Sequence, residues 1–159
     1  MKKTSVSAAV CTLLFVVVAG CRDAGRIEAD KTAVKAVLDS YITSIENEDI
    51  QLYADIFVHD PDMVNFGTEA SQRIVGWDVL KRAIEDQNAA LSGTKITQTD
   101  VTVNVSPEGR FAWATSLWSF KATMQAQAID LPVRCTWVLE KRNNKWGIVH
   151  FHKSVGTTS

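Results

Sequence analysis

The sequence predicts an α+β domain in which three N-terminal helices pack on one face of a curved, mainly antiparallel sheet. Two observations support this class. Up to Gly93, apolar residues recur with the 3.6-residue period of amphipathic helices. After Gly93, they alternate with the two-residue period of half-buried strands. Helices followed by a run of strands are typical of folds whose helices cover one side of an antiparallel sheet.

The first 20 residues are predicted to be a signal peptide outside this fold. Lys2 and Lys3 precede an apolar run from residue 6 to 18, and the run ends in Val-Ala-Gly-Cys at residues 18–21. A permanent transmembrane helix needs about 20 apolar residues, so the run is too short for one. The ending resembles the lipobox of bacterial lipoproteins, which implies cleavage before Cys21 and lipidation of its thiol. An ordinary secretory signal with a chance cysteine is the alternative.

The lipobox resemblance also implies a location. Arg22 rather than aspartate follows the cysteine, and the usual sorting of such lipoproteins then favours the outer membrane. We expect a mature chain in the bacterial cell envelope, lipid-anchored to a membrane and facing the periplasm. Residues 21–31 are polar and are expected to form a tether, followed by a single domain at residues 32–155.

Charge and cysteine content narrow the classes of partner. Without Lys2 and Lys3, the chain has 15 basic and 18 acidic residues and no basic run, so no nucleic-acid partner is expected. Besides Cys21, the mature chain contains only Cys135, which leaves no pair for an intramolecular disulfide. Cys135 lies in an alternating strand and is predicted to be a small buried hydrophobe. No cofactor is expected.

The helices follow from periodicity and capping residues. The first is predicted from residue 34 to 45, with Asp30 or Thr32 as its N-cap. Asp49 is expected to cap a short second helix. A third helix begins at Trp77, and Gly93 is expected to mark its end. Their apolar faces comprise Val34, Val37, Leu38, Tyr41, Ile42 and Ile45, then Leu52, Tyr53, Ile56 and Phe57, then Trp77, Leu80, Ala83 and Ile84.

Short strands are predicted within residues 60–69 and 71–76, between the second and third helices. Four long strands follow. They occupy residues 95–106, 110–124, 131–142 and 145–155. The last two are joined by Asn143-Asn144, a dipeptide typical of two-residue hairpin turns.

Three stretches together carry a resemblance: "NEDIQLYADIFVHDPDMVNFGTE", "GWDVLKRAI" and "TWVLEKRNNKWGIVHFHKS". They are similar to the SnoaL-like branch of the NTF2-like superfamily, which has the ketosteroid-isomerase-like cone fold. The association domain of calcium/calmodulin-dependent kinase II has a similar last strand. The resemblance implies a cone with an internal cavity, but not one activity, because the superfamily includes isomerases, dehydratases, cyclases, binding modules and oligomerisation domains.

The hairpin predicts which side of the sheet each residue of the last strand faces. If Arg142 pairs with Lys145, Trp137 faces His150 and Cys135 faces His152, with all four on one side. That side is the more aromatic, so we expect it to be the concave wall of the cavity. Phe151 then falls on the convex face, where its exposure with Val138 and Val149 predicts a homodimer contact.

Three functions remain open. The first is binding of a small, mostly apolar organic molecule in the cavity, whose expected wall consists of His150, His152, Trp137, Tyr53, Phe57 and Trp113. The second is an isomerase, dehydratase or cyclase with His150 as acid–base residue and Asp60 or Tyr41 as its partner. The third is a non-enzymatic assembly module that acts through the convex face.

Two further features bear on the ligand. His150 and His152 point the same way, but a catalytic zinc site needs a third protein ligand, and His59 lies in a separate turn. No metal is therefore expected. In the kinase association domain, arginines of the sheet enter the pocket and suit carboxylates. Trp137 occupies one such position here, which implies a more apolar ligand.

Overall fold

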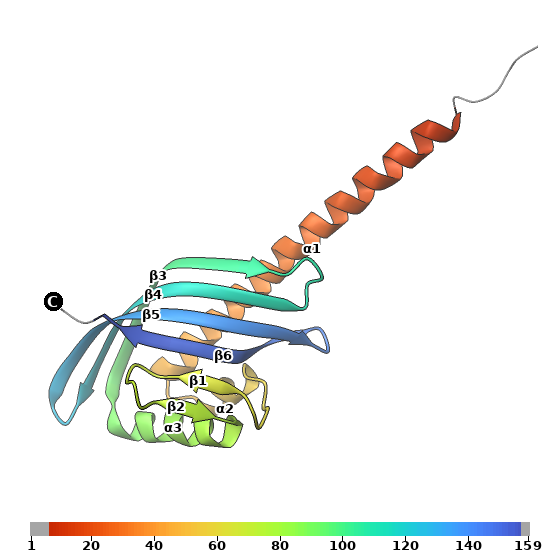
Figure 1. Ribbon diagram of the computed structural model, residues 1–159. Helices are drawn as coiled ribbons and strands as arrows, with labels where there is room; N and C mark the ends of the chain where they lie inside the picture. Colours follow the sequence, from red (N-terminus) through yellow and green to blue (C-terminus); the bar gives the residue numbers. More distant parts are fainter. Residues whose placement is uncertain (1–6, 157–159) are drawn as a thin grey trace, which may run out of the picture.

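The computed structural model describes residues 7–156, with side chains described from residue 24 onward. It is a mixed α+β fold with one sheet (Figure 1). In chain order the elements are α1 (Ser7–Glu46), α2 (Ile50–Asp55), β1 (Val64–Phe66), β2 (Arg73–Val75), α3 (Trp77–Ala90), β3 (Ser92–Val105), β4 (Phe111–Met124), β5 (Gln127–Arg142) and β6 (Lys145–Val155). The predicted order of helices and strands is confirmed.

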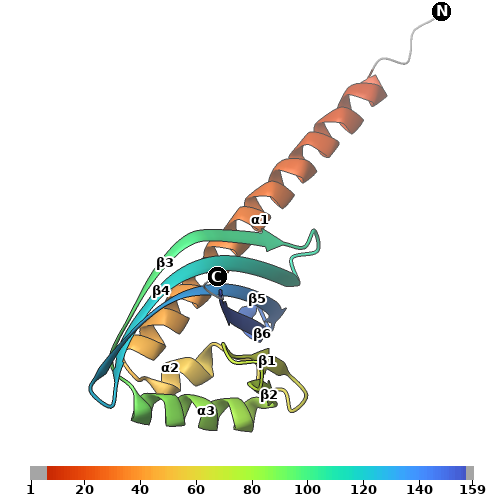
Figure 2. The same cartoon turned by 60° about the vertical axis from the view of Figure 1, so that its left-hand side comes forward.

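The six strands form a sheet in the order β2-β1-β6-β5-β4-β3. Only β1 and β6 run parallel among the paired strands of the described chain, and the other four pairs are antiparallel. The sheet curves around the helices, with α1, α2 and α3 against its concave side (Figure 2). This arrangement confirms the predicted curved, mainly antiparallel sheet.

Helix α1 begins earlier than its predicted cap. It runs without a break through residues 21–31, the segment predicted to be a tether. Asp30 does not cap a helix. It is 4% exposed, and its carboxylate accepts hydrogen bonds from Lys141 Nζ and from Trp146 Nε1, the latter at 3.1 Å. Arg26 donates to the carbonyl oxygens of Pro107 and Glu108 at 2.8 and 3.0 Å.

The predicted signal peptide and lipidation site lie partly outside the part that the structure describes, since this part excludes residues 1–6 and the side chains up to residue 23, that of Cys21 among them. Within the described part, no helix has a segment both long and apolar enough to cross a bilayer.

Local signals set the short elements as predicted. The Asp49 carboxylate accepts the backbone N–H groups of Gln51 and Leu52 at 3.1 and 2.9 Å, which caps α2. Helix α3, in contrast, ends before Gly93. The N–H of Leu91 closes its last turn on the Gln87 carbonyl at 3.0 Å, and Gly93 adopts its positive φ of 62° within β3.

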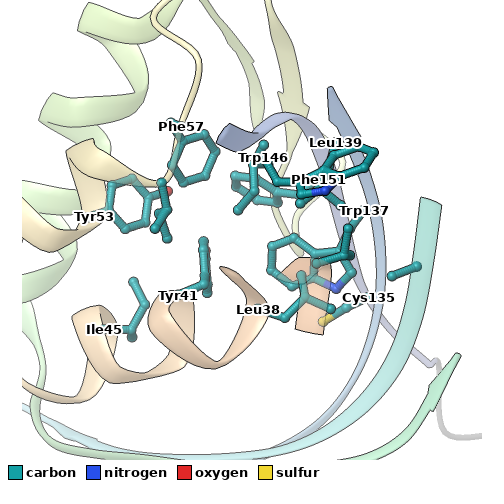
Figure 3. Close-up of a cluster of buried hydrophobic side chains, with 14 of the residues drawn as sticks. Leu38, Tyr41, Ile45, Tyr53, Phe57, Cys135, Trp137, Leu139, Trp146 and Phe151 are labelled. Carbon is teal, nitrogen blue, oxygen red and sulfur yellow. The ribbon is translucent and has the colours of Figure 1, made fainter. Parts of the chain in front are cut away.

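Aromatic side chains fill the space between α1, α2 and the concave face (Figure 3). Tyr41, which is fully buried, is the centre of this aromatic cluster. Ring centroids lie 4.7–6.0 Å from that of Tyr41 for five residues: Tyr53, Phe57, Trp118, Trp137 and Phe151. Such contacts add to the large apolar area that buried aromatic residues contribute to a core.

The β5–β6 hairpin begins in the predicted register and then shifts by one residue. Arg142 pairs with Lys145 across Asn143-Asn144, whose φ values of 50° and 60° fit a type I′ turn. Leu139 still pairs with Ile148, but Val138 pairs with His150. Val149 is therefore the extra residue of a β-bulge.

Contacts with distant segments account for the bulge. The Ile148 N–H donates to the Ile56 carbonyl at 2.8 Å, and the Ile148 carbonyl accepts from the Val58 N–H at 3.0 Å. Beyond the bulge, the Phe151 N–H donates to Oδ1 of the buried Asn65 at 2.8 Å. These bonds hold β6 on both sides of Val149, so the extra residue bends the strand without loss of its pairing.

The bulge reverses the predicted faces of the last strand. Phe151 is 2% exposed and packs in the core opposite Trp137, whereas His152 is exposed. His150 pairs with Val138 on the convex face. The predictions that both histidines face the cavity and that Phe151 contacts a partner are therefore wrong, because a one-residue shift moves every later side chain to the other face.

Candidate functional site

A pocket of about 510 Å³ lies between α3 and the concave face, next to the aromatic cluster. Its wall also includes the β1–β2 loop and the ends of β4 and β5 that lie farthest from the β5–β6 turn. Most of the lining is apolar, with Ile74, Leu80, Ile84, Trp118, Phe120, Leu131, Val133 and Phe151 among it. Polar groups come from Thr68, Glu69, Gln72, Asp86, Gln87 and Lys153.

Lys153 is the cationic side chain of this lining. It follows Phe151 by two residues on β6, so the bulge at Val149 turns both toward the concave side. Its Nζ lies 5.2 Å from the centroid of the Phe151 ring. No carboxylate among the described side chains forms an ion pair with Lys153. Burial lowers the pKa of its ammonium group.

Cys135 lies opposite Lys153 on β5. Burial raises the pKa of the Cys135 thiol to about 12, although the neighbouring Lys153 opposes the shift. The sulfur is therefore a neutral thiol at neutral pH, and it does not supply a negative charge for the lysine. Cys135 is 3% exposed, which agrees with the predicted buried hydrophobe.

Two phenols lie deeper in the cone, behind the pocket. Tyr41 and Tyr53 are both fully buried, and burial raises the pKa of each well above its ordinary value. Trp118 and Phe151 contact the Tyr41 ring and also line the pocket, so they separate the buried phenols from the pocket. Both phenols therefore act as core residues here.

The histidines predicted for the cavity lie on the convex face. The Nδ1 of His150 hydrogen-bonds to the Val64 carbonyl oxygen, so it carries the ring proton as donor. The Phe66 ring lies edge-on to the rings of His150 and His152, with centroids 6.0 and 5.6 Å away. Trp113 also lies on this face and is 49% exposed. Its predicted place in the cavity wall is wrong, because it alternates with buried Ala112 and Ala114.

Asp60 is engaged elsewhere. Its carboxylate accepts two hydrogen bonds from the Arg142 guanidinium, at 2.9 and 2.7 Å, and these bonds lower the pKa of Asp60. His150, Asp60 and Tyr41 thus occupy three separate environments, and the predicted catalytic set is not assembled. Trp137, Tyr53 and Phe57 belong to the aromatic cluster, and none of them lines the pocket described above. Among the described residues, no three potential ligands of His, Cys, Asp or Glu converge on a metal site.

Sequence reasoning missed Lys153 as a pocket residue. One signal for it was available. Gly147 is an isolated glycine inside a strand, a pattern that marks bulges and close backbone approaches. A Cβ at Gly147 would lie 2.8 Å from Val58 Cγ2, so the glycine permits the approach of the Ile56–Val58 segment that accompanies the bulge.

Comparison with solved structures defines the class of fold. An NTF2-like superfamily protein from Salmonella enterica matches with a TM-score of 0.74 and 21% identity, over 83% of this chain and 94% of the other. A protein from Xanthomonas campestris, described provisionally as a calcium/calmodulin-dependent protein kinase II association domain, matches with a TM-score of 0.68 and 22% identity, over 79% and 87%. A protein from Novosphingobium aromaticivorans, described provisionally as a scytalone dehydratase, matches with a TM-score of 0.74 and 15% identity, over 86% and 90%.

The protein therefore has the NTF2-like cone fold. The sequence model of the SnoaL-like domain family matches residues 34–158, and the chain belongs to that family. No curated protein matches the chain significantly.

Proposed function

We propose that this protein is a membrane-anchored SnoaL-like domain that binds a small, mostly apolar organic molecule. The observation that carries the proposal is the pocket of about 510 Å³ beneath α3, with Lys153 in its wall. Ligand sites in proteins are typically concave, about 300–1,000 Å³ in volume, and mostly apolar with a few oriented polar groups. The pocket has this size and composition.

The apolar wall is expected to supply most of the binding free energy, because burial of apolar surface contributes about 25 cal/mol per Å². Trp118 and Phe151 provide flat aromatic surface against which a ring or chain can pack. Lys153 is the cationic group among the polar residues of the lining. The sequence did not predict a cation in the cavity, because Trp137 stands where the kinase association domain has an arginine.

The alternative of an acid–base enzyme centred on His150 lacks support from the site. Neither His150 nor Asp60 lines the pocket, and Tyr41 is separated from it by Trp118 and Phe151. The resemblance to a protein described as a scytalone dehydratase is at 15% identity, which concerns the fold. Binding is therefore the function that the geometry favours.

A matched pair of tryptophan substitutions on α3 tests the binding proposal. Ala83 lines the pocket, whereas Lys81 is exposed on the same helix. We expect A83W to fill the pocket and to weaken binding of the neutral probe N-phenyl-1-naphthylamine at least tenfold, with K81W close to wild type. Fluorescence titration measures both. Equal binding by A83W and wild type, with retained thermal unfolding, would remove the pocket as the site.

For the quaternary structure we propose a homodimer through the convex face. Phe111, Trp113 and Leu117 alternate along β4 on that face and are 46%, 49% and 44% exposed. Exposed apolar residues gathered on one face in this way commonly mark interaction sites. W113D is expected to halve the mass measured by light scattering, and a monomeric mass for the wild-type protein would contradict the proposal.

For the location we propose lipid attachment at Cys21. Support comes from the Val-Ala-Gly-Cys ending at residues 18–21, directly behind an apolar run. Helix α1 continues without a break from Cys21 to the contacts of Arg26 with the β3–β4 turn. Five helical residues rise about 7.5 Å, so an attached lipid would hold the domain close to the bilayer. C21S is expected to move the full-length chain out of the membrane fraction. Membrane retention of C21S at the wild-type level would contradict lipidation.

A further inference from the structure

Lys153 has an unusual setting for a lysine. Its side chain lines the pocket among aromatic and aliphatic residues, with its Nζ over the Phe151 ring. No carboxylate ion pair involves it among the described side chains, and the neighbouring Cys135 thiol is neutral. A charged ammonium group in this half-buried place has lost part of its water without gaining an ion-pair partner, which is costly.

We propose that Lys153 is a nucleophilic amine that captures an apolar aldehyde or ketone as a reversible imine within the pocket. The inference rests on the proposed function, since it names the chemical class of the ligand that the same pocket takes.

The electrostatics of the site support a nucleophile. Burial lowers the pKa of Lys153, and each unit of such a shift raises the fraction of neutral amine near pH 7 about tenfold. Lysines that are desolvated in apolar pockets are activated for Schiff-base formation with carbonyl compounds for this reason. Lys121, by contrast, is exposed and forms an ion pair with Asp130 at 3.5 Å.

The same setting favours a carbonyl compound over a carboxylate. A carboxylate must lose its hydration shell to reach Lys153, and its pairing energy must first repay that cost. A neutral aldehyde or ketone with an apolar chain enters the pocket with a smaller desolvation cost. The apolar chain then packs on Trp118 and Phe151, and the carbonyl carbon meets the amine.

The proposed step is balanced without an oxidant or reductant. The neutral Lys153 nitrogen attacks the carbonyl carbon, a C–N bond forms, and the carbonyl π electrons move to the oxygen. The oxygen takes up one proton and the nitrogen releases one, which gives a neutral carbinolamine. The nitrogen lone pair then expels the hydroxyl group, which takes up a proton and leaves as water, and loss of the remaining nitrogen proton gives the imine. Glu69 and Asp86 line the pocket and are themselves exposed, so they can exchange these protons with solvent.

Reductive trapping tests the proposal directly. The mature protein is incubated with 3-phenylpropanal and sodium cyanoborohydride at neutral pH, and the modified lysines are mapped by peptide mass spectrometry. We expect Lys153 to be modified at least tenfold faster than Lys121 in the same molecules. K153R, which keeps the charge but forms no stable imine, is expected to lose this rapid adduct, and K121R is expected to keep it.

Competition with the neutral naphthylamine probe separates the two proposals. Displacement by 3-phenylpropanal with a rapid Lys153 adduct supports both. If the aldehyde displaces the probe but modifies Lys153 and Lys121 at equal rates, the binding proposal stands and the nucleophile proposal fails. If 3-phenylpropanoate displaces the probe at a lower concentration than the aldehyde does, and K153M loses this difference, the nucleophile proposal also fails and an ion pair takes its place. If neither the probe nor the aldehyde binds, both proposals fail. The comparison of two lysines within the wild-type protein remains decisive even if a variant does not fold.

Discussion

Replacement of Phe151 by alanine tests the bulged register of β6, on which the position of Lys153 depends. Phe151 is 2% exposed, and its ring centroid lies 5.9–6.1 Å from those of Tyr41, Phe57 and Trp137. Truncation of a buried phenylalanine to alanine removes these contacts and leaves a cavity, at a cost of about 3–5 kcal/mol. We therefore expect F151A to lower the free energy of unfolding by that amount.

The neighbouring histidine supplies the matched control. His152 is exposed on the convex face, and surface substitutions away from special features usually change stability by less than about 0.5 kcal/mol. Urea unfolding, followed by tryptophan fluorescence and circular dichroism, measures both variants. A shift in the urea midpoint without a change in slope identifies a change in stability.

The two registers make opposite predictions for this pair. Without the bulge, Phe151 would be exposed and His152 would pack beside Cys135 in the interior. H152A would then be the more destabilising variant. A larger loss of stability for H152A than for F151A would therefore refute the bulge, and with it the assignment of Lys153 to the pocket.

Three further predictions concern buried charge, a buried thiol and the glycine next to the bulge. Lys141 and Trp146 hold the pKa of Asp30 below its ordinary value despite burial. The contribution of the ionised Asp30 to the free energy of unfolding is therefore present above about pH 4 and is lost as the pH falls through the lowered pKa. D30N should cost about 2 kcal/mol at pH 7 and much less near pH 2, measured by urea unfolding at both pH values; an equal cost at both would contradict the assignment. With a pKa of about 12, Cys135 should react with Ellman's reagent at pH 8 only after unfolding, and rapid reaction of the native protein would argue against burial. G147A should cost about 1–3 kcal/mol through the clash with Val58, and V58A should restore part of it; additive losses would exclude that contact as the cause.

Much of the secondary structure could be predicted because its signals are local. The Asp49 cap, the Asn143-Asn144 turn and the change from helical to strand periodicity each depend on residues within a few positions of one another. The core positions of Tyr41 and Tyr53 also follow from helical spacing, since one face of an amphipathic helix must be buried. The start of α1 was less predictable, because Asp30 is a good capping residue in isolation but is used for contacts with residues more than 100 positions away.

By itself, the sequence determined the α+β class, the order of the elements, the hairpin turn and most of the core, because periodicity and turn chemistry act over short distances. Only the tertiary structure decided which face the end of β6 presents. A bulge reverses the faces that all later side chains of a strand would otherwise take. The bulge at Val149 depends on hydrogen bonds between Ile148 and the segment from Ile56 to Val58. That single inserted residue moved two histidines to the convex face and brought Lys153 into the pocket.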